Sequence, residues 1–308
     1  MGQSHGHHGH SHHHHHHVDP NSKYLGLAIA INLALSLAQV LGGLLSGSLS
    51  LVADALHNFS DAGALIIAMV ARKIGLRPAD SSHSYGYKRA EIIGTLINSS
   101  TLILVGLYLC YESILRYLDP QPIDGWIVVI VAGLALAVDI ATAILTYISG
   151  AKSNMNLRAA FIHNVSDAMA SVVVIISGTL IIFFQIYVID LIATIAISFY
   201  VIYHGLFLVK KAIRILMQSV PEDLDLNEIK IALCQTADVV NADHVHLWQL
   251  DDKLTFFEGH LIVKDGLDRK SVRKQLKQLL ESRFEIRHAT IELIECKEVD
   301  GDTKSSPC

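Results

Sequence analysis

Cysteine and charged residues are both scarce in this chain of 308 residues. Its four cysteines show no CxxC spacing and indicate no disulfide framework, so we expect the soluble part of the protein to lie in a reducing compartment. Charged residues make up 17% of the chain and hydrophobic residues 51%, which is too apolar for an ordinary soluble domain of this length. The composition therefore predicts a membrane protein and gives no support to nucleic-acid binding.

Six apolar segments are each long enough to cross the hydrocarbon layer of a bilayer as a helix. They lie near residues 24–45, 49–71, 92–117, 126–148, 159–184 and 186–209. Basic residues gather after the second, fourth and sixth segments, which places both termini in the cytoplasm. We therefore expect a multi-pass membrane protein, without a cleavable signal peptide because the first residues are polar. The compact loops favour a bacterial cytoplasmic (inner) membrane.

The distribution of charge and histidine predicts four parts along the chain. Residues 1–20 form a histidine-rich cytoplasmic tail that we expect to be disordered, and residues 21–215 form a six-helix transmembrane domain. Residues 216–297 form a cytoplasmic domain, and residues 298–308 a flexible tail. Two origins stay open for the first part: a native metal-collecting tail, or an expression tag that includes the run His12–His17.

A six-residue signature occurs twice, both times within apolar sequence. It reads HNFSDA at 57–62 and HNVSDA at 163–168. A helix turns once per 3.6 residues, so a His and an Asp four positions apart project from one face. Two copies on adjacent helices would bring two imidazoles and two carboxylates together, which is the coordination number that zinc prefers. The predicted metal ligands are His57, Asp61, His163 and Asp167.

A structural alternative to the metal site is a His–Asp hydrogen bond within each helix. Ionisable groups at membrane depth cost about 2.5–3.5 kcal/mol each on insertion scales, so the metal site or the hydrogen bond would have to offset this cost. The shared side-chain order of the two copies favours the metal site. Cobalt, iron and cadmium remain open as substrates, although the lack of a thiolate argues against a strong preference for the softest ions.

Further polar residues interrupt the apolar segments and should face the interior of the bundle. We expect Asp54 and Asp139 to line the access path, with a partly solvated cavity role as the alternative. The amides expected in the interior are Asn32, Gln39 and Asn98. Asp190 and Glu112 lie near helix ends and are expected to reach the headgroups.

The cytoplasmic part alternates helical and strand patterns. A helix, two strands, an amphipathic helix and a third strand are expected at 226–235, 244–250, 256–263, 270–284 and 288–296. This αββαβ order predicts an α+β ferredoxin-like domain attached to the six helices.

A second candidate metal cluster lies on the strands of this domain. If the hairpin pairs Leu250 with Leu254, His244 lies opposite His260, and His246 lies opposite Glu258. Further candidate ligands are Glu292, Glu295, Cys296 and Cys308. An ordinary polar sheet face is the alternative.

The chain resembles the cation diffusion facilitator family, in particular its zinc-transporting branch of bacterial zinc/proton antiporters. Beyond the two signatures, the resemblance is carried by SYGYKRAE at 84–91, NLRAAF at 156–161 and HVHLW at 244–248. It implies that the transport motif falls on the four predicted ligands. Manganese-type members carry Asp at the first ligand position, so His57 points to zinc. The resemblance also implies a homodimer.

The resemblance also implies metal positions outside the membrane helices. A loop site would use Asp80 and His83, but its third ligand position falls on Tyr87, which cannot replace an imidazole. In the cytoplasmic domain, family positions map to His246, His260 and a glutamate of the third strand. One histidine position of some members falls on Asp243.

The predicted function is that of a secondary transporter, not an enzyme: it exports Zn²⁺ from the cytoplasm in exchange for protons. Zinc could also have a structural role in the cytoplasmic domain. An intramembrane zinc hydrolase is the first rival, but no HExxH motif is present. A metal sensor that does not transport is the second rival.

Overall fold

A computed structural model describes residues 23–148, 155–236 and 238–296 of the chain. The predicted tails at 1–20 and 298–308, with Cys308, lie outside these residues. The described residues form two compact units. Unit 1 contains the described residues up to Met69 together with Asn98–Leu206, and unit 2 contains Val70–Ile97 together with the described residues from Phe207 onward.

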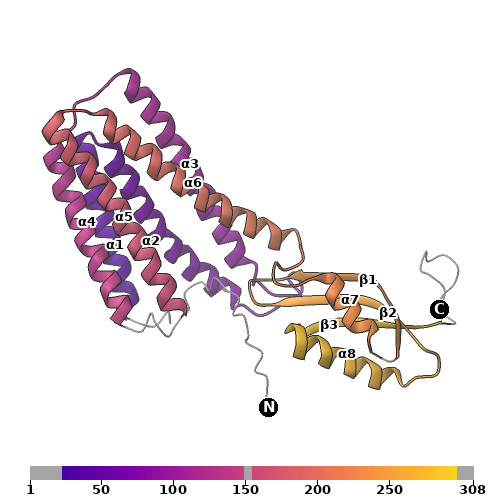
Figure 1. Cartoon of the computed structure of the whole chain (residues 1–308). Coiled ribbons are helices and arrows are strands. Elements are labelled where there is room, and N and C mark those ends of the chain that lie inside the picture. The colour runs from indigo at the N-terminus through magenta and orange to yellow at the C-terminus, as the bar shows by residue number, and fades with distance from the viewer. Residues whose placement is uncertain (1–22, 149–154, 237, 297–308) are drawn as a thin grey trace, which may run out of the picture. The chain divides into compact units, whose positions relative to one another are not determined.

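Six long helices run through the first two-thirds of the chain (Figure 1). They are α1 (Lys23–Ser46), α2 (Leu49–Gly75), α3 (Ala90–Leu118), α4 (Gly125–Thr146), α5 (Met155–Phe184) and α6 (Val188–Leu216). Among the described residues α3, α4, α6 and Phe161–Phe184 of α5 are long and apolar enough to cross a membrane. The described apolar part of α1, Leu33–Ser46, is shorter, and α2 is more polar because it carries part of the predicted site.

The core of unit 1 is built from apolar residues of five helices. Its buried members are Leu51, Ala53, Leu102, Leu109, Val128, Ala132, Val174, Ile197 and Val201. Helices α4 and α5 approach closely at two glycines: a Cβ on Gly178 would lie 2.8 Å from Val128, and one on Gly125 would lie 2.7 Å from the Gly178 carbonyl oxygen. This close packing fixes α5, which carries the second signature, against α4.

The expectation that Asp190 reaches the headgroups is wrong. Asp190 lies in the first turn of α6, is fully buried, and accepts hydrogen bonds from the Ser48 hydroxyl at 2.6 Å and the Ser50 hydroxyl at 2.5 Å. It also accepts from the backbone N–H groups of Leu49 at 2.7 Å and Ser50 at 3.3 Å. The carboxylate thus satisfies the free donors at the start of α2, where the helix dipole favours negative charge. Glu112 instead pairs with Arg116 at 3.3 Å.

Unit 2 contains the predicted αββαβ domain, and the predicted fold class is confirmed (Figure 1). Its elements are α7 (Leu226–Cys234), β1 (Val239–Gln249), β2 (Thr255–Val263), α8 (Arg269–Phe284) and β3 (His288–Glu295). The sheet order is β1-β2-β3, with β1 antiparallel and β3 parallel to β2. One face of α8 packs Val272, Leu276 and Leu280 into the core. Unit 2 also holds a small cluster of Ile92 with Ala212 and Ile215.

The hairpin between β1 and β2 contains an irregularity that the sequence pattern does not predict. The Leu250 N–H donates to the Leu254 carbonyl and His246 lies opposite Glu258, both as expected. Asp243, not His244, is the register partner of His260. The register shifts between Asp243 and His246, and His244 has a φ of 47°, because a β-bulge accommodates one extra residue there.

Candidate metal centre

The two signatures lie on α2 and α5, and in each the His and the Asp are one helical turn apart. His57 and Asp167 are well buried, with side-chain exposures of 9% and 10%. Asp61 is 30% exposed and His163 is 47% exposed. The group therefore has a buried side and an accessible side, which an ion that enters and leaves requires.

The four side chains form a closed ring in which imidazoles and carboxylates alternate. His57 Nε2 lies 3.6 Å from Asp61 Oδ2 and 3.4 Å from Asp167 Oδ1. His163 Nε2 lies 3.5 Å from Asp61 Oδ2 and 3.4 Å from Asp167 Oδ2. Each imidazole thus lies between the carboxylate of its own helix and the carboxylate of the other helix.

These distances fit a shared ion better than hydrogen bonds. An N–H···O hydrogen bond spans about 2.7–3.2 Å, so 3.4–3.6 Å is too long. The edge of a tetrahedron is about 1.63 times the distance from its centre to a vertex, so zinc bonds of about 2.0–2.1 Å place the ligand atoms about 3.3–3.4 Å apart. The four distances around the ring are close to this length, and ligand atoms of His57, Asp61 and Asp167 all lie within 4.8 Å of one another.

Several polar atoms of the ring are buried without a hydrogen-bond partner among the described residues. They are Nδ1 and Nε2 of His57, Oδ2 of Asp61 and Oδ1 of Asp167. Buried polar atoms normally have a partner, because an unsatisfied one costs about 1–3 kcal/mol. Three of the four atoms, all except His57 Nδ1, are atoms that the ring distances join, so a cation bound within the ring would satisfy them.

Two residues beside the ring were missed by the sequence analysis. Tyr200 of α6 lies edge-on to His57, with ring centroids 6.1 Å apart, and His204 packs on Tyr200 at 4.7 Å. His204 is close enough to Asp61 for a Coulombic interaction. The only available signal was their four-residue spacing in an apolar helix, which core residues share.

The two predicted access-path carboxylates are both buried and hydrogen-bonded. Asp54 accepts a 2.6 Å hydrogen bond from the Gln39 amide, and Gln39 in turn accepts one from Asn58 at 3.1 Å. Asp139 accepts from the Ser171 hydroxyl at 3.2 Å. These bonds join α1 to α2 and α4 to α5, so both carboxylates have structural roles in addition to any role in access.

The candidate cluster of the cytoplasmic domain is brought together despite the bulge. The His244 ring lies 4.8 Å from the His246 ring and 5.0 Å from the His260 ring, centroid to centroid. His260 Nε2 lies 3.2 Å from a carboxylate oxygen of Glu292. Three imidazoles and one carboxylate thus share an accessible face of the sheet.

Glu295 does not join this cluster. It pairs with Arg269 at 3.2 Å, and because it lies three residues from Glu292 its side chain is on the other face of β3. Cys296 directly follows β3, and its role as a ligand stays a prediction.

The predicted loop site contains a hydrogen-bonded carboxylate. Asp80 accepts hydrogen bonds from the Tyr87 hydroxyl at 2.7 Å and from the backbone N–H groups of Ser82 and His83. The hydrogen bond from Tyr87 is the largest cause that lowers the pKa of Asp80 to about 2, and the two backbone hydrogen bonds are the next largest. The same hydrogen bond raises the pKa of Tyr87, so the phenol keeps its proton and is a poor metal ligand.

The comparisons with known proteins agree with this architecture. The cation efflux transmembrane domain matches residues 25–217, and the cytoplasmic domain of cation efflux proteins matches residues 221–294. The zinc transporter ZitB of Pectobacterium atrosepticum is 34% identical, covering 92% of this chain and 88% of the relative. The cadmium, cobalt and zinc/H(+)-K(+) antiporter of Bacillus subtilis is 31% identical, covering 89% of each chain.

A solved structure also matches part of the chain. The metal-bound C-terminal domain of the CzcD transporter of Cupriavidus metallidurans is 26% identical, with a TM-score of 0.22, and the match covers 23% of this chain and 99% of that domain. The prediction that the chain is not an enzyme is confirmed by its transporter relatives. Matched by family models in both domains and by relatives along most of its length, the chain belongs to the cation efflux family of membrane transporters, the cation diffusion facilitators.

Proposed function

We propose that this protein is a secondary transporter that exports Zn²⁺ from the cytoplasm in exchange for protons. The ion would bind between α2 and α5, held by His57, Asp61, His163 and Asp167. The alternating ring carries this proposal, because its spacing of 3.4–3.6 Å suits a tetrahedral ion and is too long for hydrogen bonds.

Proton exchange follows from the ligand types. Zinc binds neutral imidazoles and ionised carboxylates, so an ion and protons compete for the same atoms. Imidazole titrates close to neutral pH in water, which makes the two histidines the natural proton carriers of a His–Asp ring. Binding of zinc from the cytoplasm would release protons, and protonation on the far side would release zinc.

The relatives support metal efflux and leave several details to this proposal. The names of these relatives include zinc, cadmium and cobalt, and one name includes exchange with H⁺ and K⁺. We assign zinc as the main substrate because two imidazoles and two carboxylates suit it. We also propose a homodimer in a bacterial inner membrane with both termini in the cytoplasm.

A second zinc site in the cytoplasmic domain is part of the same proposal. His244, His246, His260 and Glu292 supply three nitrogen ligands and one oxygen ligand on one accessible face. The 3.2 Å distance between His260 and Glu292 also suits a hydrogen bond, so this site rests on weaker geometry than the ring. Its role would be structural, since it lies outside the membrane helices.

The decisive experiment measures zinc flux and zinc binding on the same protein. Residues 1–17 are deleted first, because their histidines would bind metal independently. In proteoliposomes with an acidic lumen, the parent protein should accumulate zinc, and Asp61→Ala and Asp167→Ala should abolish the accumulation. Zinc affinity should fall more than about 100-fold, because loss of an outer-shell partner alone typically costs about 10–100-fold.

Ser166→Ala is the matched control. Its hydroxyl lies between the two α5 ligands in sequence and, among the described residues, donates to the helix carbonyl of Ile162. Flux in this variant should remain at the parent level. Wild-type flux in Asp167→Ala would remove the ring from the mechanism, and zinc binding without pH-driven uptake would favour a sensor.

A further inference from the structure

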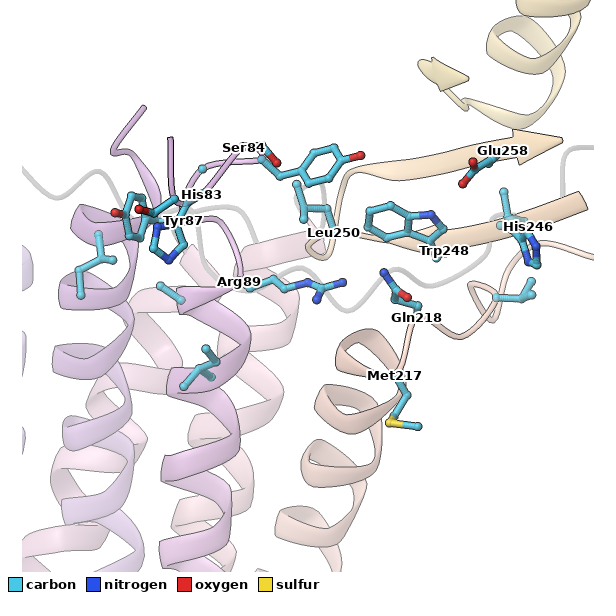
Figure 2. A pocket seen from close by; sticks show the side chains of 18 of the residues that line it. His83, Ser84, Tyr87, Arg89, Met217, Gln218, His246, Trp248, Leu250 and Glu258 are labelled. Carbon is cyan, nitrogen blue, oxygen red and sulfur yellow. The ribbon is translucent and has the colours of Figure 1, made fainter. Parts of the chain in front are cut away.

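Unit 2 contains a cavity of about 1080 Å³, and of the residues that line it only His246 has a role in the transport proposal. Its walls come from the loop before α3, the start of α3, the residues after α6, and strands β1 and β2. Figure 2 shows Arg89 reaching from the start of α3 toward Trp248 on β1, with Gln218 after α6 on the same side.

Arg89 is the cation of this cavity. Its guanidinium carbon lies 5.8 Å from the centroid of the Trp248 ring. Its Nε is buried and has no hydrogen-bond partner in the part of the chain that the structure describes. No carboxylate within the same residues pairs with it, although Glu258 lines the cavity beside His246 (Figure 2). An arginine with an unused, buried donor is suited to a planar or tetrahedral oxyanion, which it binds through two N–H groups.

Two aromatic side chains, Tyr85 and Trp248, line the cavity. Trp248 stacks on Phe256 with centroids 4.6 Å apart, and Tyr85 lies edge-on to both rings at 6.0 and 5.4 Å. Tyr and Trp are enriched where an apolar environment meets water, because each has an apolar body and a polar tip.

The position of the cavity along the chain sets its depth in the membrane. Arg89 immediately precedes α3 and Gln218 closely follows α6, and both helices are apolar enough to cross a bilayer. The exposed apolar side chains Ile93 and Met217 line the same cavity from these helix ends. Arg89 lies three residues before the apolar segment expected near residues 92–117, so its guanidinium is at headgroup level, and Ile93 lies within that segment, where acyl chains begin.

We propose that this cavity binds a phosphate-bearing anion through Arg89, and that the anion is the headgroup of an acidic phospholipid. The guanidinium would hold the phosphate oxygens, Gln218 would offer a neutral donor, and Ile93 would contact the first methylenes of the acyl chains. A free phosphate has the same oxyanion but cannot use the apolar contact.

Trp248 is a built-in reporter for this site. The chain has two tryptophans, so Trp126→Phe leaves Trp248 as the only one. In this background the full-length protein in detergent is titrated with inorganic phosphate and with phosphatidylglycerol, each against potassium chloride of equal ionic strength. Phosphatidylglycerol should change the Trp248 emission saturably and at lower concentration than phosphate, whereas phosphatidylcholine should have a much weaker effect.

Three variants test the role of Arg89. Arg89→Gln should weaken phosphatidylglycerol binding at least about tenfold, because it removes a charge-assisted hydrogen bond. Arg89→Lys keeps the charge but loses the bidentate geometry, so its affinity for phosphatidylglycerol should lie between those of the parent protein and Arg89→Gln. Lys88→Gln is the matched control: it removes a neighbouring charge that does not line the cavity and should change binding less than about twofold.

Native mass spectrometry of the purified protein supplies a second readout that does not depend on fluorescence. The parent protein and Lys88→Gln should retain phosphatidylglycerol, and Arg89→Gln should not. Equal retention by Arg89→Gln, or no response to either anion, would overturn the proposal. A response to phosphate without one to phosphatidylglycerol would overturn the headgroup assignment. None of these readouts involves zinc, so they are independent of the transport proposal.

Discussion

The hydroxyl of Ser48 donates a 2.6 Å hydrogen bond to the carboxylate of Asp190, which lies 142 residues later in the chain. This bond joins the start of α2 to the first turn of α6, and both residues are fully buried. Helix α2 carries His57 and Asp61 a few turns further along. The position of half of the candidate metal centre therefore depends on a carboxylate that is not itself a ligand.

Replacement of Asp190 should destabilise unit 1 without changing the ligands. In Asp190→Asn one oxygen becomes an N–H₂ group that faces donors, so we expect a loss of about 2–3 kcal/mol in unfolding free energy. Thermal unfolding of the detergent-purified protein measures the change as a lower Tm. Asp119→Asn, at an exposed position just after α3, is the control and should leave the Tm unchanged. An unchanged Tm in Asp190→Asn would show that the hydrogen bonds to this carboxylate do not stabilise unit 1.

Variants of the Gln39–Asp54 pair can distinguish a structural role of Asp54 from a role in the access path. Gln39→Leu leaves the buried Asp54 carboxylate without its 2.6 Å donor and should cost about 1–3 kcal/mol. The double variant Gln39→Leu with Asp54→Leu removes both partners and should recover part of this loss. Zinc affinity at equilibrium should stay unchanged in the double variant, while a slower zinc flux would support the access path. No recovery of stability would show that the two side chains are not coupled.

The loop hydrogen bond predicts a pH dependence with a defined sign. The pKa of Asp80 is lowered from 3.8 to about 2 by the Tyr87 hydroxyl and backbone N–H groups. The ionised carboxylate therefore stabilises the loop fully above pH 3.8, and this stabilisation is lost as the pH falls toward about 2.

Tyr87→Phe removes the main cause and should raise the pKa of Asp80 toward 3.8. The loop would then open at higher pH than in the parent protein. The rate of pepsin cleavage within residues 80–87, followed across the acidic range, measures the opening. Ser84→Ala is the control, and identical pH profiles for Tyr87→Phe and the parent would contradict the assignment.

The cytoplasmic cluster predicts a second zinc ion that is independent of the ring. In a protein that lacks residues 1–17 and carries Asp61→Ala with Asp167→Ala, the remaining zinc should be bound by the cytoplasmic domain. His260→Ala removes the residue that contacts both His244 and Glu292 and should abolish that binding. His288→Ala, at an exposed position on β3, is the control. Full zinc retention in His260→Ala would assign the cluster to an ordinary polar sheet face.

Long apolar segments and local periodicity were enough to predict the helices, because the membrane imposes their length and hydrophobicity. The four ring residues were predicted for a related reason. Ionisable side chains are costly at membrane depth, so a repeated His–Asp pair at helical spacing indicates that the residues share a metal ion. The geometry of the ring and its unpartnered atoms required the structure, since they depend on how α2 packs against α5.

The missed features share a physical cause, which is that they depend on long-range contacts or on the backbone. Asp190 was expected at the headgroups because its donors lie about 140 residues earlier in the sequence. The pairing of His244 with His260 was wrong because a bulge shifts the register, and β-bulges leave no clear mark in the residue pattern. Tyr200 and His204 could not be distinguished from core residues before the neighbours of α6 were known.

If the ring binds an ion as proposed, its alternating imidazoles and carboxylates would divide the ligands equally between two helices. Each Nε2 of the ring lies beside a carboxylate oxygen of the other helix, so a small separation of α2 from α5 would break two of the four metal–ligand bonds at once and leave each helix with only two ligands. Neither helix would have to unwind for this to happen. A rigid-body movement shorter than the width of a side chain would then turn one closed four-ligand site into two open pairs, one of which would release the ion to water.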